Sequence, residues 1–244
     1  EASSDSEAER VRKLPYLQLV GALLYLSTMS RPDIAFHLSV LCSFMQNPGM
    51  QCFEAAQSVL LYVGATRDLN MQFSSSFAVP DSLSAFANDI RKQHGVYAYS
   101  DSTWTAPKST CGYVVFFAGG PIAWSSRKLN VIADSSALAE YSCASATCKE
   151  LIFVRNLLSE LHVQIPGPVT LAVDNSAAIK IAKERGVTKL TKHFDFAAHR
   201  IRSEYEHLRV FPTWVDTFDQ TADLFTKALE EHAFVRHRDK LLRR

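Results

Sequence analysis

Four acidic residues of this 244-residue chain lie in or beside apolar segments, where carboxylates are uncommon. Asp101 ends the apolar run VYAYS, and Asp174 ends the run LAV. Glu140, in LAEYS, and Asp223, in TADLF, lie near the start of segments with helical spacing. Because the carboxyl ends of strands in an open α/β sheet meet at one edge, we expect these four side chains to lie together.

Four carboxylates at one edge would repel each other unless cations lie between them. Ligands made only of oxygen suit Mg²⁺ or Mn²⁺ rather than zinc. Two such ions can stabilise the attacking and leaving oxygens of a phosphoryl transfer. Taken singly, each acid has a simpler explanation as a helix cap, a turn residue or a partner of the helix dipole. The prediction of a two-ion site therefore rests on the four acids and their order.

The segment that must position these acids alternates strands and helices. Apolar and β-branched runs predict strands at 96–100, 112–118, 122–126, 168–173 and 209–215, with a tight GGP turn between the second and third. Helical spacing predicts helices at about 135–161, after residue 174, at 191–206 and at about 219–230. This order predicts an α/β domain at 96–230, with a mixed five-stranded sheet flanked by helices.

The residues before this domain have a different pattern. The pattern of residues 1–73 predicts a small all-helical segment, in which residues 1–12 are frayed or severed from a segment upstream and Pro32 begins a helix. The Ser-rich stretch 74–95 predicts a linker, and 231–244 predicts a basic tail. We found no cluster of catalytic residue types in the helical segment.

Composition sets limits on function without naming one. The chain is 47% hydrophobic and 21% charged with a net charge of +1, so any basic surface for nucleic acid must be local. Five cysteines fit no zinc or disulfide spacing, and we expect them to be reduced in an intracellular protein. No signal peptide is recognised, and the most apolar stretch, 17–27, is too short to span a bilayer, so no membrane partner is expected.

Six motifs give the chain a family resemblance. In order, they are YSDSTW, KSTCGYVVFFAGGPIAWSSRK, SSALAEY, VDNSAAIKIAK, TKHFDF and QTADLFTKAL. With these motifs, residues 96–230 resemble the ribonuclease H domain of Ty1/copia-type retrotransposon polyproteins. Residues 15–67 resemble the segment that joins reverse transcriptase to that nuclease in the same polyproteins.

The resemblance implies a fold and an activity. The fold is the ribonuclease H-like sheet, and the activity is endonucleolytic, metal-dependent hydrolysis of the RNA strand of RNA–DNA hybrids. Asp101 would bridge two Mg²⁺ or Mn²⁺ ions, and Asp174 would hold the ion that activates water. Glu140 and Asp223 would complete the coordination shells of the two ions. The implied partners are the hybrid and the reverse transcriptase and integrase parts of the polyprotein. The implied location is intracellular, in a cytoplasmic virus-like particle and in the nucleus.

Candidate substrate contacts follow from position and charge. Ser102, Asn175 and Ser176 adjoin the acids and could read 2′-hydroxyls. Trp104 could stack on bases. A basic stretch fits phosphate contacts or, equally well, a solvated helix face; it contains Lys180, Lys183, Arg185, Lys189, Lys192, Arg200 and Arg202. His193 and His199 lack matching cysteines, which favours helix packing over zinc binding.

Rival interpretations remain open at this stage. The chain departs from the family pattern at Thr103, at Ala137 and Leu138, and at Ala197, so a catalytically decayed nucleic-acid-binding remnant of the same fold is the main alternative. An integrase-like strand transferase fits the order of the acids less well. A nucleotide-binding module would need a Gly-rich phosphate loop after a strand. The chain lacks the polymerase signature Tyr-x-Asp-Asp, so we expect no DNA synthesis from it alone.

Overall fold

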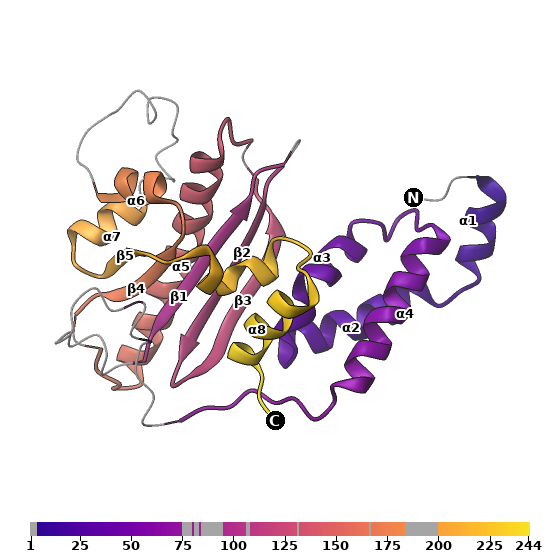
Figure 1. Cartoon of the computed structure of the whole chain (residues 1–244), viewed down its shortest axis with the longest axis horizontal. Coiled ribbons are helices and arrows are strands. Elements are labelled where there is room, and N and C mark those ends of the chain that lie inside the picture. Colours follow the sequence, from indigo (N-terminus) through magenta and orange to yellow (C-terminus); the bar gives the residue numbers. More distant parts are fainter. Residues whose placement is uncertain are drawn as a thin grey trace. The chain divides into compact units, whose positions relative to one another are not determined.

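The computed structural model describes residues 4–74, 80, 83, 95–105, 108–130, 132–165, 167–183 and 200–244 (Figure 1). The chain divides into two compact units, one of residues 1–71 with 241–244 and the other of residues 72–240. Most of the expected linker 74–95 lies outside the described residues. Across the described ranges, no helix has both the length and the apolar character that crossing a bilayer requires.

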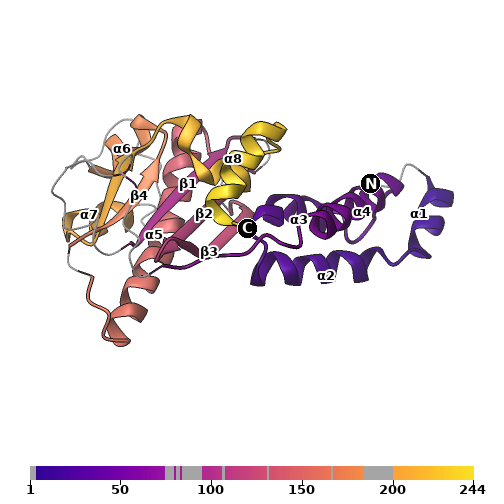
Figure 2. The ribbon, with the colours of Figure 1, turned by 60° about the horizontal axis from the view of Figure 1, so that its bottom comes forward.

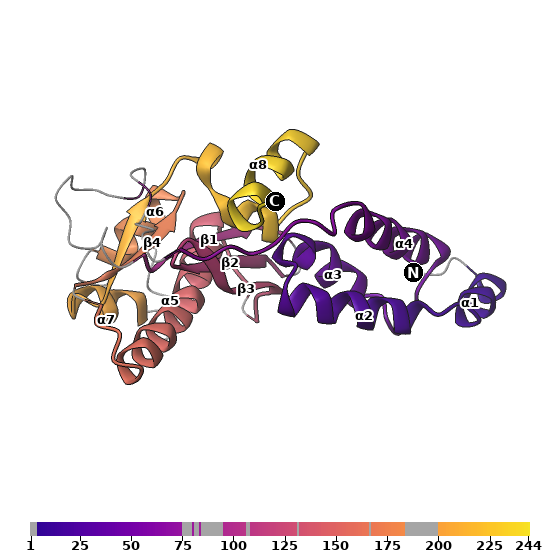
Figure 3. The ribbon, with the colours of Figure 1, turned by 90° about the horizontal axis from the view of Figure 1, so that it is seen from below.

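The first unit is helical, as the sequence predicts. It contains α1 (Asp5–Arg12), α2 (Tyr16–Met29), the 3₁₀ turn η1 (Pro32–Ile34), α3 (Ala35–Cys42) and α4 (Met50–Ala65). Figure 3 shows α2, α3 and α4 side by side. Their apolar faces form a small core of Tyr16, Val20, Leu23, Ile34, Leu38, Leu41 and Ala56. Pro32 begins η1, as expected for a residue whose φ is already helical.

A buried ion pair fixes the turn between α2 and α3. Arg31 donates from Nε and Nη2 to the two Asp33 oxygens at 2.9 and 2.7 Å. Tyr62 donates its hydroxyl to Asp33 Oδ2 at 2.6 Å, and Arg31 Nη2 also donates to Thr66 Oγ1 at 2.7 Å. Because both charges are buried, loss of either partner would leave the other charge unpaired and destabilise the contact between α4 and the turn.

The expectation that residues 1–12 are frayed is wrong for most of them, because Asp5–Arg12 forms α1. Ser4 caps the helix by accepting a hydrogen bond from Glu7 N. Glu7 Oε1 accepts a hydrogen bond from Met50 N at 2.8 Å, and Val11 is buried. These tertiary contacts give the polar segment a fixed place that its composition did not indicate.

The second unit is built on a five-stranded mixed sheet. Its strands are β1 (Tyr97–Thr103), β2 (Thr110–Phe117), β3 (Gly120–Lys128), β4 (Val169–Val173) and β5 (Val210–Trp214). The strand order is β3-β2-β1-β4-β5; β1, β2 and β3 pair antiparallel, whereas β4 and β5 run parallel to β1. Ala118 and Gly119, both with positive φ, make the predicted tight turn between β2 and β3. The predicted mixed sheet is confirmed.

The long helix α5 (Ser136–Glu160) crosses one face of this sheet (Figure 2). Its residues Cys148, Leu151 and Leu158 pack with Val115 and Leu171 of the strands in the main core. On the opposite face, the rings of Tyr97 and Phe116 stack with their centroids 4.9 Å apart. Both rings are buried, so this part of the opposite face is shielded from solvent as well.

Shorter elements complete the unit. They are α6 (Ser176–Lys183), α7 (Arg200–Glu206), the 3₁₀ turns η5 (Thr217–Asp219) and η6 (Thr221–Phe225), and α8 (Glu231–Leu241). The prediction of a helix at about 219–230 is wrong, because the chain forms the 3₁₀ turns η5 and η6 in this region instead. Most of the expected basic tail at 231–244 forms α8, and Arg243 pairs with Asn70 in the first unit.

The cysteines differ from the expectation that all five are reduced. Cys111 of β2 and Cys143 of α5 form a disulfide, whereas Cys42, Cys52 and Cys148 are free. The two half-cystines are 32 residues apart in sequence, and neither is accessible to solvent. Spacing alone could not indicate this pair, because strand and helix bring the two residues together only in the folded sheet. The disulfide ties the start of α5 to β2.

We expect reduction of this disulfide to lower the free energy of unfolding by about 2–4 kcal/mol, because the bridge limits the freedom of the unfolded chain. Urea denaturation followed by circular dichroism, with and without dithiothreitol, measures the difference. A Cys111→Ala, Cys143→Ala double variant is the control and should not respond to the reductant. Equal denaturation midpoints for the wild-type chain under the two conditions would contradict the disulfide.

Candidate metal centre

Three of the predicted acids meet at the edge of the sheet where β1 and β4 end. Asp101 lies on β1, Glu140 lies near the start of α5, and Asp174 follows β4 directly. One carboxylate oxygen from each lies within 4.8 Å of the others. Asp101 and Glu140 are only 4% and 5% exposed, and Asp174 is half-buried. Strand direction therefore brings distant acids together, as the sequence predicts.

The position of Asp101 depends on a glycine in the neighbouring strand. Asp101 pairs with Gly112 of β2, on the sheet face opposite α5. A Cβ atom at residue 112 would lie 2.6 Å from Phe225 Cβ and from Thr226 Cγ2. Glycine thus lets the segment after η6 lie directly on the sheet. There, Thr226 donates its hydroxyl to Asp101 Oδ2.

Glu140 reaches the site from the first turns of α5. Ser135 caps the helix by accepting a hydrogen bond from Leu138 N at 3.2 Å. Glu140 Oε1 accepts a hydrogen bond from Ser102 N at 3.0 Å. Burial and the negative charges of Asp101 and Asp174 together raise the pKa of Glu140 from 4.5 to about 10, although the Ser102 amide lowers it. Without a cation, this carboxyl group keeps its proton.

Asp174 occupies the junction of β4 and α6. Its Oδ2 accepts a hydrogen bond from Thr217 Oγ1 at 3.3 Å, and the next residue, Asn175, caps α6 by accepting from Ala178 N at 3.1 Å. Burial raises the pKa of Asp174, as does the charge of Asp101, while Thr217 and Lys227 lower it. The capping role belongs to Asn175, which leaves the Asp174 carboxylate directed to the cluster.

Asp223 lies beside Asp101 but outside the set of three. It belongs to η6, which Gln220 anchors to β1 by donating from Nε2 to Ser100 O at 3.0 Å. Burial and the charge of Asp101 raise the pKa of Asp223 from 3.8 to about 7, although Lys227 lowers it. Lys227 lies one turn further along and its Nζ forms an ion pair with Asp223 Oδ2 at 2.8 Å.

The donor set fits a divalent metal ion. Its ligand atoms are all carboxylate oxygens, which hard cations prefer. In the part of the chain that the structure describes, no N–H or hydroxyl group donates to the buried oxygens Glu140 Oε2 and Asp223 Oδ1, and both carboxyl groups interact with the carboxylate of Asp101. Buried carboxylate oxygens without such donors are costly unless a cation binds them. The cluster therefore has the charge and the open coordination positions that such an ion needs.

The predicted substrate contacts occupy varied places. Ser102 is buried, and its backbone N–H donates to Glu140. Asn175 caps α6, and the next residue, Ser176, is exposed. Lys180 is exposed on α6, whereas Lys183 lies with its Nζ 4.5 Å from the centre of the Phe211 ring. Arg185, Lys189, Lys192, His193 and His199 lie outside the described residues.

Sequence reasoning missed three residues that contact the acids. These are Thr217, Thr226 and Lys227, which contact Asp174, Asp101 and Asp223 respectively. The Asp223–Lys227 pair had a detectable signal, because charges four residues apart often pair when the chain turns helically. The two threonines had none, since hydroxyl contacts between distant segments leave no pattern in a single sequence.

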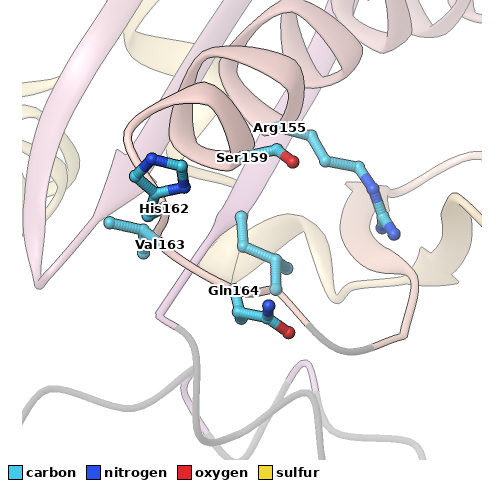
Figure 4. A pocket seen from close by; sticks show the side chains of 6 residues that line it. Arg155, Ser159, His162, Val163 and Gln164 are labelled. Atoms are coloured by element: carbon cyan, nitrogen blue, oxygen red, sulfur yellow. The ribbon is translucent and has the colours of Figure 1, made fainter.

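A separate pocket of about 240 Å³ lies at the far end of α5 (Figure 4). Arg155, Ser159, His162, Val163, Gln164 and Ile165 line it. At a rise of 1.5 Å per residue, it begins, at Arg155, about 22 Å along the helix from Glu140. Arg155 already donates to the carbonyl oxygens of Gly167 and Arg209. The pocket has no carboxylate, so it does not resemble the metal centre.

Comparisons with known proteins give the family context. The chain is 31% identical over 234 residues to the retrovirus-related Pol polyprotein from transposon TNT 1-94 of Nicotiana tabacum, covering 93% of this chain and 16% of that protein. It is 30% identical over 230 residues to the retrovirus-related Pol polyprotein from transposon RE1 of Arabidopsis thaliana, and this match covers 93% of this chain and 15% of that protein. A putative Ty5-1 transposon protein of Saccharomyces cerevisiae is 35% identical over 142 residues, and this match covers 56% of this chain and 41% of that protein. No family model matches the chain.

These relatives are Ty1/copia-type retrotransposon proteins, and the tobacco and Arabidopsis ones are Pol polyproteins, which confirms the resemblance predicted from the motifs. The chain spans about a sixth of the length of the tobacco and Arabidopsis proteins.

Two solved structures also match. They are the N-terminal RNase H domain of a Mycobacterium tuberculosis protein, solved as a fusion with maltose-binding protein, and an RNase H1 in complex with an RNA/DNA hybrid. The first is 14% identical, and the match covers 58% of this chain and 94% of that structure. The second is 12% identical, and the match covers 54% of this chain and 93% of that structure. Each has a TM-score of 0.37. The fold assignment rests on the strand order and pairing described above.

We expect the stability of the chain in EDTA to fall as pH rises from about 5.5 to 8. In this range the folded state retains the Glu140 proton, whose pKa is raised from 4.5 to about 10, and the unfolded chain has lost it, so a higher pH favours unfolding. Asp223, with a pKa of about 7, adds to the effect in the lower part of the range. Thermal melts at the two pH values measure it.

A Glu140→Gln variant supplies the control for this pH dependence. Glutamine cannot ionise, so its stability should change less between the two pH values than that of the wild-type chain. An identical change in both proteins would show that Glu140 does not titrate as the geometry requires.

Proposed function

We propose that this chain is the ribonuclease H module of a retrotransposon polyprotein and hydrolyses the RNA strand of RNA–DNA hybrids. The observation that carries the proposal is the convergence of Asp101, Glu140 and Asp174 within 4.8 Å at the edge of a mixed sheet, with Asp223 beside them. The Pol polyprotein homologues support it, because they match this chain over nearly its whole length.

Two Mg²⁺ or Mn²⁺ ions fit the proposed reaction, with Asp101, Glu140, Asp174 and Asp223 as their ligands. When bound, such ions lower the pKa of water and neutralise charge on the phosphate oxygens in the transition state. Hydrolysis would break the P–O3′ bond, giving 5′-phosphate and 3′-hydroxyl ends. Water is the nucleophile, so no covalent intermediate with the protein is required.

The side chains around the acids serve to hold them in place. Thr226 orients Asp101, the Ser102 amide orients Glu140, and Thr217 orients Asp174, each through one hydrogen bond. Each of these bonds leaves a carboxylate oxygen able to accept another ligand. Lys227 offsets part of the negative charge beside Asp223. A prearranged set of this kind avoids reorganisation when the substrate binds.

The same proposal covers the partners of the chain. The hybrid would be the substrate, and exposed Lys180 on α6 is a candidate phosphate contact. The reverse transcriptase and integrase parts of the parent polyprotein would be its neighbours, and this chain alone would not synthesise DNA. A cytoplasmic virus-like particle, and the nucleus after it, would be the places where it acts.

We expect Asp101→Asn and Asp174→Asn each to lower the rate of hybrid cleavage by at least about 10²-fold, because each removes a charged ligand from the site of transition-state charge. The assay is cleavage of an end-labelled RNA–DNA hybrid with Mg²⁺, with EDTA as the blank. Asp134→Asn, which changes an exposed aspartate just before α5, is the matched control and should retain wild-type activity.

Two results would contradict the proposal in different ways. Wild-type cleavage by Asp174→Asn would show that the site is assigned wrongly. A wild-type chain that binds the hybrid and never cuts it, at any Mg²⁺ or Mn²⁺ concentration, would support the decayed nucleic-acid-binding remnant instead.

A further inference from the structure

The short turn η5 carries an exposed ring directly beside a contact of the metal centre. Phe218 follows Thr217, whose hydroxyl donates to Asp174 Oδ2 at 3.3 Å. The backbone N–H of Phe218 donates to Asp216 Oδ1 at 2.8 Å, and the Phe218 side chain is 61% exposed. The backbone of η5 therefore fixes this ring next to the acidic cluster.

Arg236 of α8 is held on this ring by stacking rather than by an ion pair. Its guanidinium carbon lies 3.6 Å from the centre of the Phe218 ring. Among the described residues, no carboxylate forms an ion pair with Arg236, and its buried Nε has no acceptor. The other arginine and the lysines of this region are each paired with an acid, namely Arg238 with Asp239, Lys240 with Asp219 and Lys227 with Asp223.

The stacked guanidinium presents hydrogen-bond donors in a fixed plane. Stacking uses the flat faces of the group and leaves the N–H groups at its edge to donate. Two of these N–H groups can donate to two oxygens of one phosphate. Because Nε is buried, the two Nη groups are the donors that a ligand would reach. Phe218 thus prearranges a pair of donors without an acceptor among the described residues.

The surroundings of Arg236 also favour an anion. The next residue, His237, is buried, and its pKa is lowered from 6.5 to about 4. Burial is the largest cause, the positive charges of Lys240, Arg236 and Lys227 add to it, and Asp219 opposes them. Positive charge therefore outweighs negative charge at this point of α8. An anion bound by Arg236 would be stabilised by the same excess.

The stacked pair is close enough to the metal centre to contact the same nucleic acid. Because consecutive Cα atoms are about 3.8 Å apart, the path from Asp174 Oδ2 through Thr217 and Phe218 to the guanidinium is at most about 17 Å long. One strand of a duplex advances about 3.4 Å along its axis per nucleotide. The distance therefore corresponds to about five nucleotides or fewer.

We propose that Arg236, stacked on Phe218, binds a backbone phosphate of the nucleic acid within about five nucleotides of the phosphate that the metal centre cleaves. This inference rests on the proposed function. A phosphate fits better than a base edge, because its two oxygens match the guanidinium and because most hydrogen bonds between proteins and nucleic acids go to the backbone. The contact adds affinity without sequence preference and takes no part in the chemical step.

The test measures binding without turnover and without metal. The full chain, as Asp101→Asn to prevent cleavage and to lower the charge of the acidic cluster, is titrated in EDTA with a fluorescent RNA–DNA hybrid across a KCl series. Adding Arg236→Gln should weaken binding about tenfold at low salt and reduce the slope of log K against log[KCl] by about 0.9, because one phosphate contact is lost. The loss should be equal for hybrids of different sequence.

Two further variants separate the charge from the stacked geometry. Arg236→Lys keeps the charge, so the slope should return to the parent value while the affinity recovers only in part, because an ammonium lacks the planar fork of donors. Lys149→Gln is the matched control for loss of a charge. Lys149 is exposed on α5, which lies on the other side of the sheet from α8 (Figure 3), so this variant should bind like the parent. Thermal melts check that every variant is folded.

In the cleaving chain, Arg236→Gln should raise KM with little change in kcat. Equal slopes for the parent and Arg236→Gln, or an equal reduction by Lys149→Gln, would overturn the inference. A lower kcat with unchanged hybrid affinity would overturn it as well, because that result belongs to a clamp that only holds η5. If the slope changes as expected and the wild-type chain does not cleave hybrid, the proposed function fails and the phosphate contact stands.

Discussion

The close approach of Asp101, Glu140 and Asp174 is the constraint that the rest of the second unit has to maintain, because the three cannot all be ionised there unless a cation binds between them. Their oxygens lie within 4.8 Å of one another in a largely buried place, and the raised pKa values of Glu140 and Asp174 follow from burial and from this proximity. Folding forms the cluster although it opposes stability. An arrangement that costs stability and leaves buried oxygens without N–H or hydroxyl donors is typical of a site that binds a cation and acts on a substrate.

The rest of the fold can be understood as the means of enforcing that arrangement. Parallel pairing of β1 with β4 brings Asp101 and Asp174 to one edge, and Ser135 begins α5 so that Glu140 faces it. Gly112 lets the η6 segment approach β2, and Gln220 fastens that segment to β1. The cross-link between Cys111 and Cys143 secures the start of α5 from the side. Apart from the Ser135 cap, each of these contacts joins segments that are far apart in sequence.

Much of this was predictable because the relevant signals are local or depend on strand order. Asp101 and Asp174 end apolar runs, and strands that run parallel place their ends at one edge, so the convergence of the acids followed from sequence. The irregular 217–226 segment did not, since its shape comes from contacts to Ser100 and Asp101 rather than from its own spacing. The disulfide and α1 were missed for the same reason: partners in distant segments determine them.

Anomalous scattering from crystals soaked in Mn²⁺ tests the central claim most directly, because it locates the ion without relying on activity. The account predicts a peak within coordination distance of Asp101, Glu140 and Asp174, and a second one that shares Asp101 and includes Asp223. The Asp101→Asn variant should lose both. Crystals of the wild-type chain that show no manganese at Asp101 under saturating soaks would contradict the claim that this cluster is a metal centre.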